Sequence, residues 1–171
     1  TNVDDQFYKA GFDKERTFAT QGSYRYIQCS QACHNKIYDA TELVKEMIKK
    51  TVNCKIPSEL VPVCPVCGEK METNLRKDAF FVQDDNWYKQ SKRYERFIEN
   101  AINKKVVLLE FGVGFNTPGI IRFPFEQMTY QNKNWNLVRF NKDDCNTFFD
   151  IENKTILVEN DINEIVKNLV I

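Results

Sequence analysis

Hydrophobic positions recur in the second half of the chain with spacings that predict alternating strands and helices. Residues 106–111 form a nearly continuous apolar run that ends in glycines, which is typical of a strand in a parallel sheet covered on both faces. Further strands are predicted at residues 136–140 and 155–158, and helices at residues 116–130 and from about Asp161. This alternation of strand and helix predicts an α/β fold.

The first half of the chain contains shorter segments of regular pattern. The alternating residues 24–27 predict one strand, and the apolar residues 79–82 predict a second. Residues 39–52 predict a helix with Asp39 as its N-cap, because the apolar side chains of this segment fall on one helical face. A longer helix is predicted at residues 87–103, with aromatic and aliphatic side chains facing inward.

Composition and charge narrow the class of protein. The chain has 171 residues, of which 42% are hydrophobic and 13 are phenylalanine, so it can build a packed core. Its 24 basic and 24 acidic residues balance, which argues against a nucleic-acid-binding surface. No apolar run approaches the roughly 20 residues that span a membrane, and no export signal is recognisable. We therefore expect a cytoplasmic protein that binds neither nucleic acid nor membrane.

Four of the six cysteines occur in two closely spaced pairs. Cys64 and Cys67 belong to the sequence Cys-Pro-Val-Cys-Gly, in which Gly68 allows a tight turn around a metal ion. Cys29 and Cys33 are separated by one more residue and can serve the same ion. Four thiolates favour a tetrahedral zinc ion in a closed, structural site. The alternative is two unrelated pairs of buried cysteines.

The other metal-binding side chains near these pairs have no clear place in the site. His34 is the only histidine and adjoins Cys33, so it could replace a cysteine as a ligand, but we interpret it as a bystander. Cys54 and Cys145 have no partner at a useful spacing and are interpreted as plain thiols. A zinc ion closed by four cysteines has no open position for water, so we expect no chemistry at this metal.

A second group of residues has the pattern of a nucleotide-binding loop. Gly112, Val113 and Gly114 follow an apolar strand, where glycines let the backbone approach a ligand closely. Asn141 follows the next predicted strand and can hydrogen-bond a ribose. Taken alone, each feature is also compatible with an ordinary turn. Arg122 lies in a mostly apolar helix and is interpreted either as a contact to a phosphate or partner, or as a surface arginine.

Taken in order along the chain, these features resemble the sirtuin family. The segment Thr1-Asn2-Val3-Asp4 resembles the sirtuin motif Thr-Gln-Asn-Ile-Asp, and Gln21 stands where sirtuins have the histidine of their catalytic His-Gly. The two cysteine pairs follow, and then residues 75–82 resemble the sirtuin run Leu-Arg-Pro-x-Val-Val-x-Phe beside the substrate groove. The resemblance continues through the glycines and Asn141, and it covers nearly the whole chain.

The resemblance implies a specific set of site residues. It makes Asn2 and Gln21 the catalytic pair, and it places zinc on Cys29, Cys33 and the second cysteine pair. It also implies NAD as the cofactor. The residues expected to contact NAD are Thr1, Asn2, Val3, Asp4, Gly112, Val113, Gly114, Asn141, Lys142, Asp143 and Ile162.

The fold implied by the resemblance is a Rossmann-like parallel sheet into which a small four-cysteine zinc module is inserted. Residues 1–22 are expected to hold the end of one NAD-binding half and the catalytic loop, residues 23–78 the zinc module, and residues 79–171 the rest of the NAD-binding domain. The opening strand and the phosphate loop of the family have no counterpart in the chain. The chain therefore resembles only the C-terminal part of such an enzyme and is expected to bind NAD poorly by itself.

Gln21 is a departure from the family with chemical consequences. A deacylating sirtuin uses histidine as a general base, whereas an amide cannot take a proton near neutral pH. Cleavage of the nicotinamide bond needs less help at this position, which favours ADP-ribosyl transfer to a protein nucleophile. Gln21 and residues 112–126 resemble the macrodomain-linked microbial sirtuins of class M. That resemblance implies ADP-ribosylation of a lipoylated carrier similar to the glycine-cleavage H protein, reversed by a partner macrodomain hydrolase.

Two alternative functions stay open from the sequence. An NAD-dependent protein deacylase would need another base in place of Gln21, and none is evident because His34 lies between the cysteine pairs. A non-enzymatic zinc-bearing binding module would need neither NAD nor a base. We expect the ADP-ribosyltransferase in preference to both.

Overall fold

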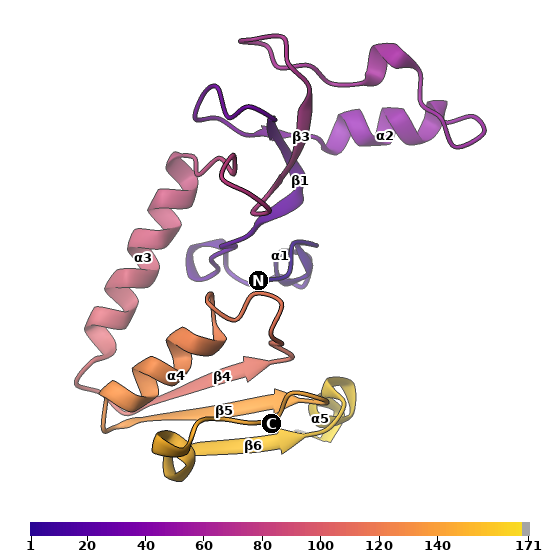
Figure 1. The fold of residues 1–171 in the computed structure, drawn as a ribbon. Coiled ribbons are helices and arrows are strands. Elements are labelled where there is room, and N and C mark those ends of the chain that lie inside the picture. The colour runs from indigo at the N-terminus through magenta and orange to yellow at the C-terminus, as the bar shows by residue number, and fades with distance from the viewer. Residues whose placement is uncertain (169–171) are drawn as a thin grey trace. The chain divides into compact units, whose positions relative to one another are not determined.

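The structure, a computed structural model, describes residues 1–168 of the chain (Figure 1). It contains two compact units, of which the first is Thr1–Arg96 and the second begins at Phe97. The long helix α3 (Asp85–Ala101) contributes residues to both units. Because helices and strands occur in each unit, the chain has the mixed α/β composition that the sequence predicts.

The first unit is organised around a small antiparallel sheet. Its strands are ordered β2 (Tyr38–Asp39), β1 (Gly22–Cys29) and β3 (Met71–Leu75). The unit also contains most of the long helix α3. Its other helical segments are α1 (Gln6–Lys9), η1 (Lys14–Arg16), α2 (Thr41–Lys50) and η2 (Ser58–Leu60). The strand predicted at residues 24–27 is confirmed as the middle of β1.

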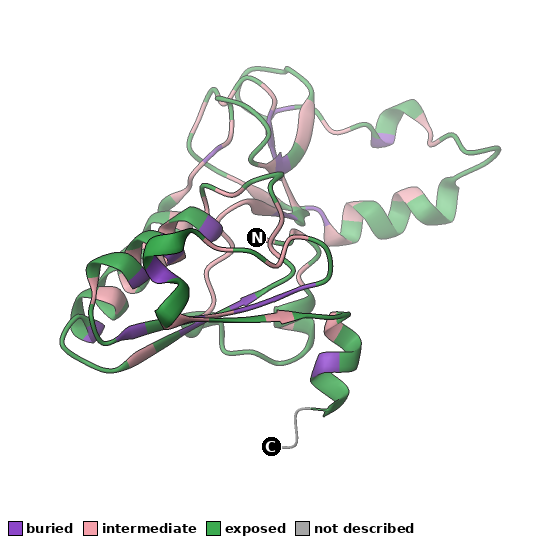
Figure 2. Cartoon of the chain, turned by 60° about the horizontal axis from the view of Figure 1, so that its bottom comes forward, coloured by how far each residue is buried: buried purple, intermediate pink, exposed green. Residues whose placement is uncertain are grey.

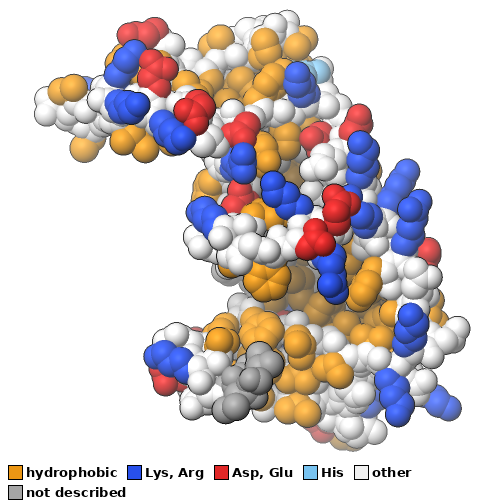
Figure 3. Space-filling view, turned by 180° about the vertical axis from the view of Figure 1, so that it is seen from behind, with side chains coloured by type: hydrophobic (Ala, Val, Ile, Leu, Met, Phe, Trp, Pro, Cys, Tyr) orange, Lys and Arg blue, Asp and Glu red, His pale blue; other side chains and the backbone are white. Residues whose placement is uncertain are grey.

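Helix α2 (Thr41–Lys50) forms within the predicted segment, but the prediction of Asp39 as its N-cap is wrong, because Ala40 occupies that position. It begins at Thr41, and the Asp39 carboxylate accepts a hydrogen bond of 2.9 Å from the Thr41 backbone N–H. None of its residues is buried, and Ile48 on its apolar face is 69% exposed. Figure 3 shows acidic and basic side chains mixed along this helix. The apolar face therefore has no partner within the described part of the chain.

The prediction of a strand at residues 79–82 is wrong. This segment is irregular because buried side-chain amides, rather than a neighbouring strand, satisfy its backbone groups. The Gln28 side chain donates to Phe80 O at 2.8 Å and accepts from Val82 N at 2.9 Å. The Asn74 side chain donates to Val82 O at 3.0 Å and to Gln28 Oε1 at 2.6 Å. The chain therefore lies against the sheet without joining it.

The second unit contains a parallel sheet of three strands. Their order is β4 (Val106–Phe111), β5 (Trp135–Asn141) and β6 (Thr155–Glu159). The three predicted strands and their parallel direction are confirmed. The helical segments are α4 (Arg122–Gln131), η3 (Phe149–Lys154) and α5 (Ile162–Asn168). Within residues 1–168, no helix combines the length and apolarity required to cross a membrane.

One face of this sheet carries the hydrophobic core of the unit. Leu108, Trp135, Leu137 and Ile151 are buried there, and side chains of α4 pack against them. Figure 2 shows buried positions on the helices and strands of this unit. The opposite face is apolar but open among the described residues, since Val107 is 58% exposed. Figure 3 shows hydrophobic side chains gathered on this unit. Of the two covered faces that the sequence predicts, the described residues therefore cover one.

The helix predicted at residues 116–130 forms only in its second part. Helix α4 begins at Arg122, and residues 116–121 are irregular. Pro118 and Gly119 are poor helix residues, because proline lacks an N–H group and glycine has a flexible backbone. The irregular segment leads the chain from β4 across the end of the sheet.

Candidate functional site

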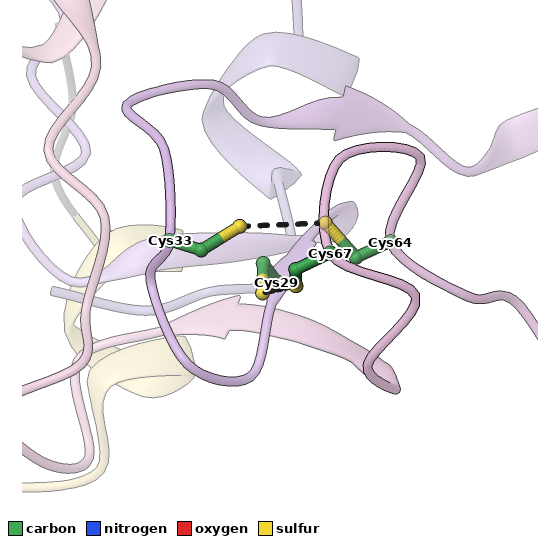
Figure 4. Close-up of side chains that lie close together, drawn as sticks. All are labelled: Cys29, Cys33, Cys64 and Cys67. Carbon is green, nitrogen blue, oxygen red and sulfur yellow. Dashed lines mark hydrogen bonds between the residues drawn. The ribbon is translucent and has the colours of Figure 1, made fainter.

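Four cysteine side chains of the first unit point toward one another (Figure 4). The Sγ atoms of Cys29, Cys33, Cys64 and Cys67 all lie within 4.8 Å of each other. The Cys29–Cys67 and Cys33–Cys64 sulfur distances are both 3.6 Å, far from disulfide length. Tetrahedral zinc with bonds of about 2.3 Å separates its sulfurs by roughly 3.8 Å. The four thiols are therefore spaced to hold one metal ion.

Local backbone geometry places the second cysteine pair. Gly68 has a φ of 77°, and its N–H donates to Cys64 O at 2.9 Å, which closes a tight turn. The Cys64 N–H donates to Glu69 O at 2.6 Å, so the turn is held at both sides. Cys29 lies at the end of β1 and is completely buried. The pattern Cys-Pro-Val-Cys-Gly thus forms the kind of turn that the sequence predicts.

Backbone amides bias the buried thiols of the cluster toward their ionised form. Burial raises the pKa of Cys64, but hydrogen bonds from the backbone of Cys67 and Val66 outweigh it and bring the pKa to about 6. A hydrogen bond from the Cys33 backbone lowers the pKa of Cys29. The pKa of Cys33 is raised, chiefly by its hydrogen bond with the Cys67 side chain, and the pKa of Cys67 is raised as well. Thiolates are the metal-binding form of cysteine, so the lowered pKa favours metal binding at Cys29 and Cys64, two of the four sulfurs.

His34 lies beside the cluster and contacts it. Its Nδ1 atom is 3.1 Å from Cys33 Sγ and 3.8 Å from Cys64 Sγ. Its Nε2 atom is 2.9 Å from the Tyr38 hydroxyl. A thiolate can only accept a hydrogen bond, so Nδ1 donates to Cys33 when that sulfur is ionised, and the Tyr38 hydroxyl then donates to Nε2. His34 is therefore a hydrogen-bonded neighbour of the cluster, rather than a side chain without contact to it.

The two remaining cysteines do not join the cluster. Cys54 is exposed, and the Cys145 thiol lies 3.7 Å from Arg139 O in the second unit. Among the described residues, the only group of side chains spaced for a metal ion is the set of four cysteines.

Gln21 occupies a turn that immediately precedes β1. Its backbone O accepts a 3.1 Å hydrogen bond from Arg76 N, and Trp87 Nε1 donates to the neighbouring Thr20 O at 3.3 Å. Gly22 has a φ of 82°, and a Cβ atom there would come within 2.0 Å of Asn74 O. Only glycine fits at this position, so the backbone direction at Gln21 is fixed. The Gln21 side chain is half-buried.

A cavity lies in the first unit next to this turn. Its volume is about 200 Å³, and Gly22 and Ser23 contribute to its wall together with side chains from α3. Arg25 and Tyr26 from β1 also line it, so its wall is mixed in polarity. Gln21 itself does not line this cavity, which leaves the predicted catalytic side chain outside it.

The predicted residues at the start of the chain form a loop against β1. Val3 O accepts a hydrogen bond of 2.9 Å from Tyr24 N. The Asp4 carboxylate accepts one of 3.2 Å from Gln6 N, which starts α1. Asn2 is exposed, and Thr1 is half-buried. The catalytic and ribose-binding roles of these residues stay predictions.

The predicted nucleotide-binding residues of the second unit gather at the carboxyl ends of β4 and β5. Gly112 has a φ of 61°, and a Cβ atom there would lie 2.8 Å from Ile162 Cδ1. The Asn141 side chain donates to Val113 O at 3.1 Å and accepts from Asp143 N at 3.1 Å. Ligands of open α/β sheets bind at this end of the strands. The NAD contacts of these residues, including Gly114 and the exposed Lys142, stay predictions.

Arg122 is the clearest difference between the sequence interpretation and the structure. The sequence suggests a contact to phosphate or partner, or a surface position, whereas the side chain is 1% exposed. Its guanidinium donates to backbone carbonyls in the loops after β4 and β5, including Val113 O at 3.3 Å and Asp144 O at 3.0 Å. The interpretation as a surface arginine is therefore wrong, and the contact to a phosphate or partner stays a prediction.

Next to Arg122 lies a buried ionic network that sequence reasoning missed. Arg139 is fully buried, and its guanidinium pairs with Glu110 at 2.7 Å and with Glu126 at 2.8 Å. Glu110 and Arg139 are direct neighbours in the β4–β5 register. The sequence does contain a signal for this network. Glu110 and Arg139 each lie two residues after a buried leucine, Leu108 and Leu137, and therefore on the same inward strand face.

Comparisons with known proteins give two relatives with related names. The chain is 35% identical over 167 residues to a "Protein ADP-ribosyltransferase" of Staphylococcus aureus (strain Mu50 / ATCC 700699), which covers 97% of the chain and 53% of that relative. It is 31% identical over 140 residues to a "Probable bifunctional ADP-ribose hydrolase/ADP-ribosyltransferase" of Fusarium oxysporum f. sp. cubense, covering 77% of the chain and 23% of that protein. No protein-family model matches the chain. The chain thus spans about half the length of the bacterial relative, and its similarity to proteins named for ADP-ribosyl transfer covers nearly all its residues.

Proposed function

We propose that this chain is part of a sirtuin-like, NAD-dependent protein ADP-ribosyltransferase. The observation that carries the proposal is the 35% identity to a protein ADP-ribosyltransferase across 97% of the chain. The loops of the second unit that carry Gly112 and Asn141 support it, because they meet at the end of a parallel sheet where nucleotides commonly bind. Gln21 supports transfer rather than deacylation, because an amide hydrogen-bonds but does not accept a proton.

The proposed reaction exchanges one bond at the sugar for another. The bond between the nicotinamide nitrogen and the ribose C1′ breaks, nicotinamide leaves with the bonding electron pair, and a nucleophile on the acceptor protein bonds to C1′ while losing its proton. Asn2 and Gln21 are proposed to orient the reacting groups through hydrogen bonds. Val3, Asp4 and Thr1 are proposed to line the ribose pocket, and the loops of the second unit are proposed to hold the adenosine part.

A deacylase is the weaker proposal because Gln21 stands where a deacylating sirtuin has its histidine base. The one histidine of the chain is His34, which is hydrogen-bonded to Cys33 and Tyr38 beside the cysteine cluster. The cluster includes Cys29 at the end of β1, whereas Gln21 directly precedes Gly22 at the start of the same strand. His34 is thus committed elsewhere and does not replace the missing base.

We propose that the four-cysteine cluster holds a structural zinc ion. Four thiolates within 4.8 Å of one another suit a tetrahedral zinc ion, and they would leave no open position for water. Cys29, Cys33, Cys64 and Cys67 would be the ligands. Elemental analysis of the purified protein should give one zinc per chain, and a Cys54→Ser variant should retain it. Loss of zinc in Cys64→Ser but not in Cys54→Ser supports the assignment, whereas a protein purified without zinc contradicts it.

We further propose a lipoylated carrier protein as acceptor and a macrodomain hydrolase as the enzyme that reverses the modification. The name of the fungal relative supports the second part, since it joins ADP-ribose hydrolase and ADP-ribosyltransferase in one protein. The carrier follows from the resemblance to macrodomain-linked sirtuins alone and is the part that the experiment must decide.

The test is an assay of the full-length protein with NAD and a carrier in lipoylated and unlipoylated forms. Mass spectrometry of the intact carrier should show one added ADP-ribose on the lipoylated form. Gln21→Ala should abolish the addition, whereas Gln131→Ala, an exposed glutamine at the end of α4, should not. An unchanged carrier together with consumption of an acetyl-lysine peptide would favour the deacylase. No binding of NAD by calorimetry would favour a non-enzymatic module.

A further inference from the structure

Arg122 is a charged side chain inside the second unit for which the proposed reaction has no role. It is the first residue of α4 and is 1% exposed. A buried arginine is costly unless its N–H groups find acceptors, so their partners show what the side chain does. Those partners lie in both loops that are proposed to bind the nucleotide.

The hydrogen bonds of Arg122 connect the loop after β4 with the loop after β5. Nη1 donates to Val113 O at 3.3 Å and to Asp144 O at 3.0 Å. Nη2 donates to Asn146 O at 3.0 Å and to Asn146 Oδ1 at 2.6 Å. One planar guanidinium thus spans two loops that come from different strands.

A further contact restrains the first loop from the side. The Phe115 ring lies over the guanidinium of Arg122, with 4.2 Å between the ring centroid and Cζ. Nε faces Glu126 Oε1 at 3.9 Å, too far for a hydrogen bond but close enough for charge compensation. The four N–H bonds of Nη1 and Nη2 are all used, so Arg122 has none of them free for a phosphate.

The same loops are joined by a second, weaker connection. The Asn141 side chain donates to Val113 O at 3.1 Å, so this carbonyl accepts from both Asn141 and Arg122. Asn141 Oδ1 also accepts from Asp143 N and Asp144 N, at 3.1 and 3.2 Å. Asn141 therefore restrains one end of the second loop and Arg122 the other. Together they determine how far apart the glycines and the ribose-binding side chain lie.

We propose that Arg122 is a positioning residue that presets the two nucleotide-binding loops and thereby sets the affinity for the ADP-ribose part of NAD. The inference rests on the proposed function, since it takes these loops as the binding site. Loops that are already ordered lose less conformational entropy when the ligand binds. Lysine cannot replace Arg122, because its single ammonium nitrogen cannot reach acceptors in both loops with a planar fork.

The test compares Arg122→Lys and Arg122→Met with the wild type in the full-length protein. Calorimetry should show ADP-ribose binding weakened by roughly tenfold or more in both variants, since small misplacements of binding groups are costly. Steady-state assays with NAD should show KM raised more than kcat is lowered. Asn146→Ala removes only one of the hydrogen bonds and keeps the backbone carbonyl, so it should weaken binding less and serves if the Arg122 variants do not fold.

Hydrogen exchange separates a positioning role from a merely structural one. In Arg122→Met, residues 112–117 and 142–147 should lose protection while the core of β4 and β5 keeps it. The matched control is Leu137→Ala, which opens the hydrophobic core of the same unit without touching either loop. At a temperature where both variants are folded, the control should bind ADP-ribose like the wild type.

The outcomes distinguish this inference from the proposed function. Unchanged ADP-ribose affinity in folded Arg122→Met and Asn146→Ala would overturn the inference, as would equal weakening in Leu137→Ala. A wild-type protein that binds neither NAD nor ADP-ribose would overturn the proposed function and the affinity part of the inference together. In that case the exchange experiment still decides whether Arg122 orders the loops.

Discussion

In the first unit thiols and amides make up half of the buried side chains, whereas the second unit buries a cluster of apolar side chains beneath α4. Cys29, Cys64, Gln28 and Asn74 are almost fully buried in the first unit. Among the described residues, the packed hydrophobic cluster around Trp135 belongs to the second unit. Because the first unit has little apolar area to bury, we expect its stability to depend on its buried hydrogen bonds and on the proposed metal ion.

The second unit adds charge to its apolar core rather than replacing it. Arg122, Arg139, Glu110 and Glu126 carry two charges of each sign and are all at most 8% exposed. Their hydrogen bonds lead outward to the loops at the carboxyl ends of the strands. We infer that buried polar side chains have different roles in the two units. In the first unit they stabilise the fold, and in the second they order the loops.

The largest expected effect is the unfolding of the first unit when the metal is removed. Structural zinc contributes about 10 kcal/mol or more to small domains of this kind, so chelation or Cys64→Ser should unfold β1 and β3. The second unit should keep its fold, because its core does not involve the cysteines. Hydrogen exchange read separately for β1 and β5 measures both responses.

Cys54→Ser is the matched control, since Cys54 is an exposed thiol outside the cluster. It should leave exchange in β1 unchanged, with or without chelator. Protected amides in β1 and β3 of the metal-free protein would show that the buried amides alone hold the first unit together. That result would contradict the inferred difference between the two units, because the first unit would then be stable without a metal.

The next largest effect is expected from Arg139→Met in the second unit. It leaves Glu110 and Glu126 buried without their partner, which typically costs about 3–5 kcal/mol. The chain has two tryptophans, and Trp135 is buried in the second unit. In a Trp87→Phe background, urea unfolding followed by Trp135 fluorescence therefore measures the loss in that unit.

An exposed ion pair provides the control for this substitution. Arg25 pairs with Asp39 at 2.7 Å in the first unit, and both side chains are more than 40% exposed. Arg25→Met should cost less than about 1 kcal/mol, because water solvates the remaining charge. Equal losses in the two variants would mean that burial of the Arg139 network is not what makes it important.

Local patterns were sufficient to predict part of this structure. Strands β4, β5 and β6 are predicted from apolar runs, and the cysteine cluster is predicted from the spacing of the two cysteine pairs. Both patterns involve residues close together in the sequence, so one sequence is enough to recognise them. The spacing of Cys64 and Cys67, for example, fixes the turn that brings their sulfurs together.

Features that depend on distant residues could not be predicted in the same way. Residues 79–82 look like a strand, but the Gln28 side chain, 54 residues before Val82 in the sequence, hydrogen-bonds their backbone groups. Arg122 looks like a surface or ligand-binding residue until the loops from two strands fold around it. In both cases a polar side chain substitutes for backbone pairing, and its partners become visible only in the folded chain.

A smaller effect is expected from Gly22→Ala beside the predicted catalytic Gln21. The substitution combines an unfavourable φ of 82° with a Cβ atom 2.0 Å from Asn74 O, so we expect a loss of about 2–3 kcal/mol. Gly11→Ala is the matched control, because Gly11 has a φ of 84° but no atom within 4 Å of the added Cβ. Chemical denaturation of both variants separates the steric cost from the cost of φ, and equal losses would show that the contact with Asn74 relaxes freely.

The smallest effect concerns the hydrogen bond between His34 and the cysteine cluster. His34→Phe keeps a ring of similar size but removes the donor to Cys33 Sγ, so metal release should become about tenfold faster, equivalent to about 1.4 kcal/mol. Tyr38→Phe, which frees Nε2, should have a weaker effect of the same sign. Transfer of the metal to a chromogenic chelator measures both rates, with the exposed Tyr24→Phe on β1 as control. An unchanged rate in His34→Phe would make this side chain the bystander that the sequence predicts. Faster release would instead show that hydrogen bonds around the cysteines stabilise the bound metal, as the hydrogen bonds of Arg122 are proposed to order the loops of the second unit.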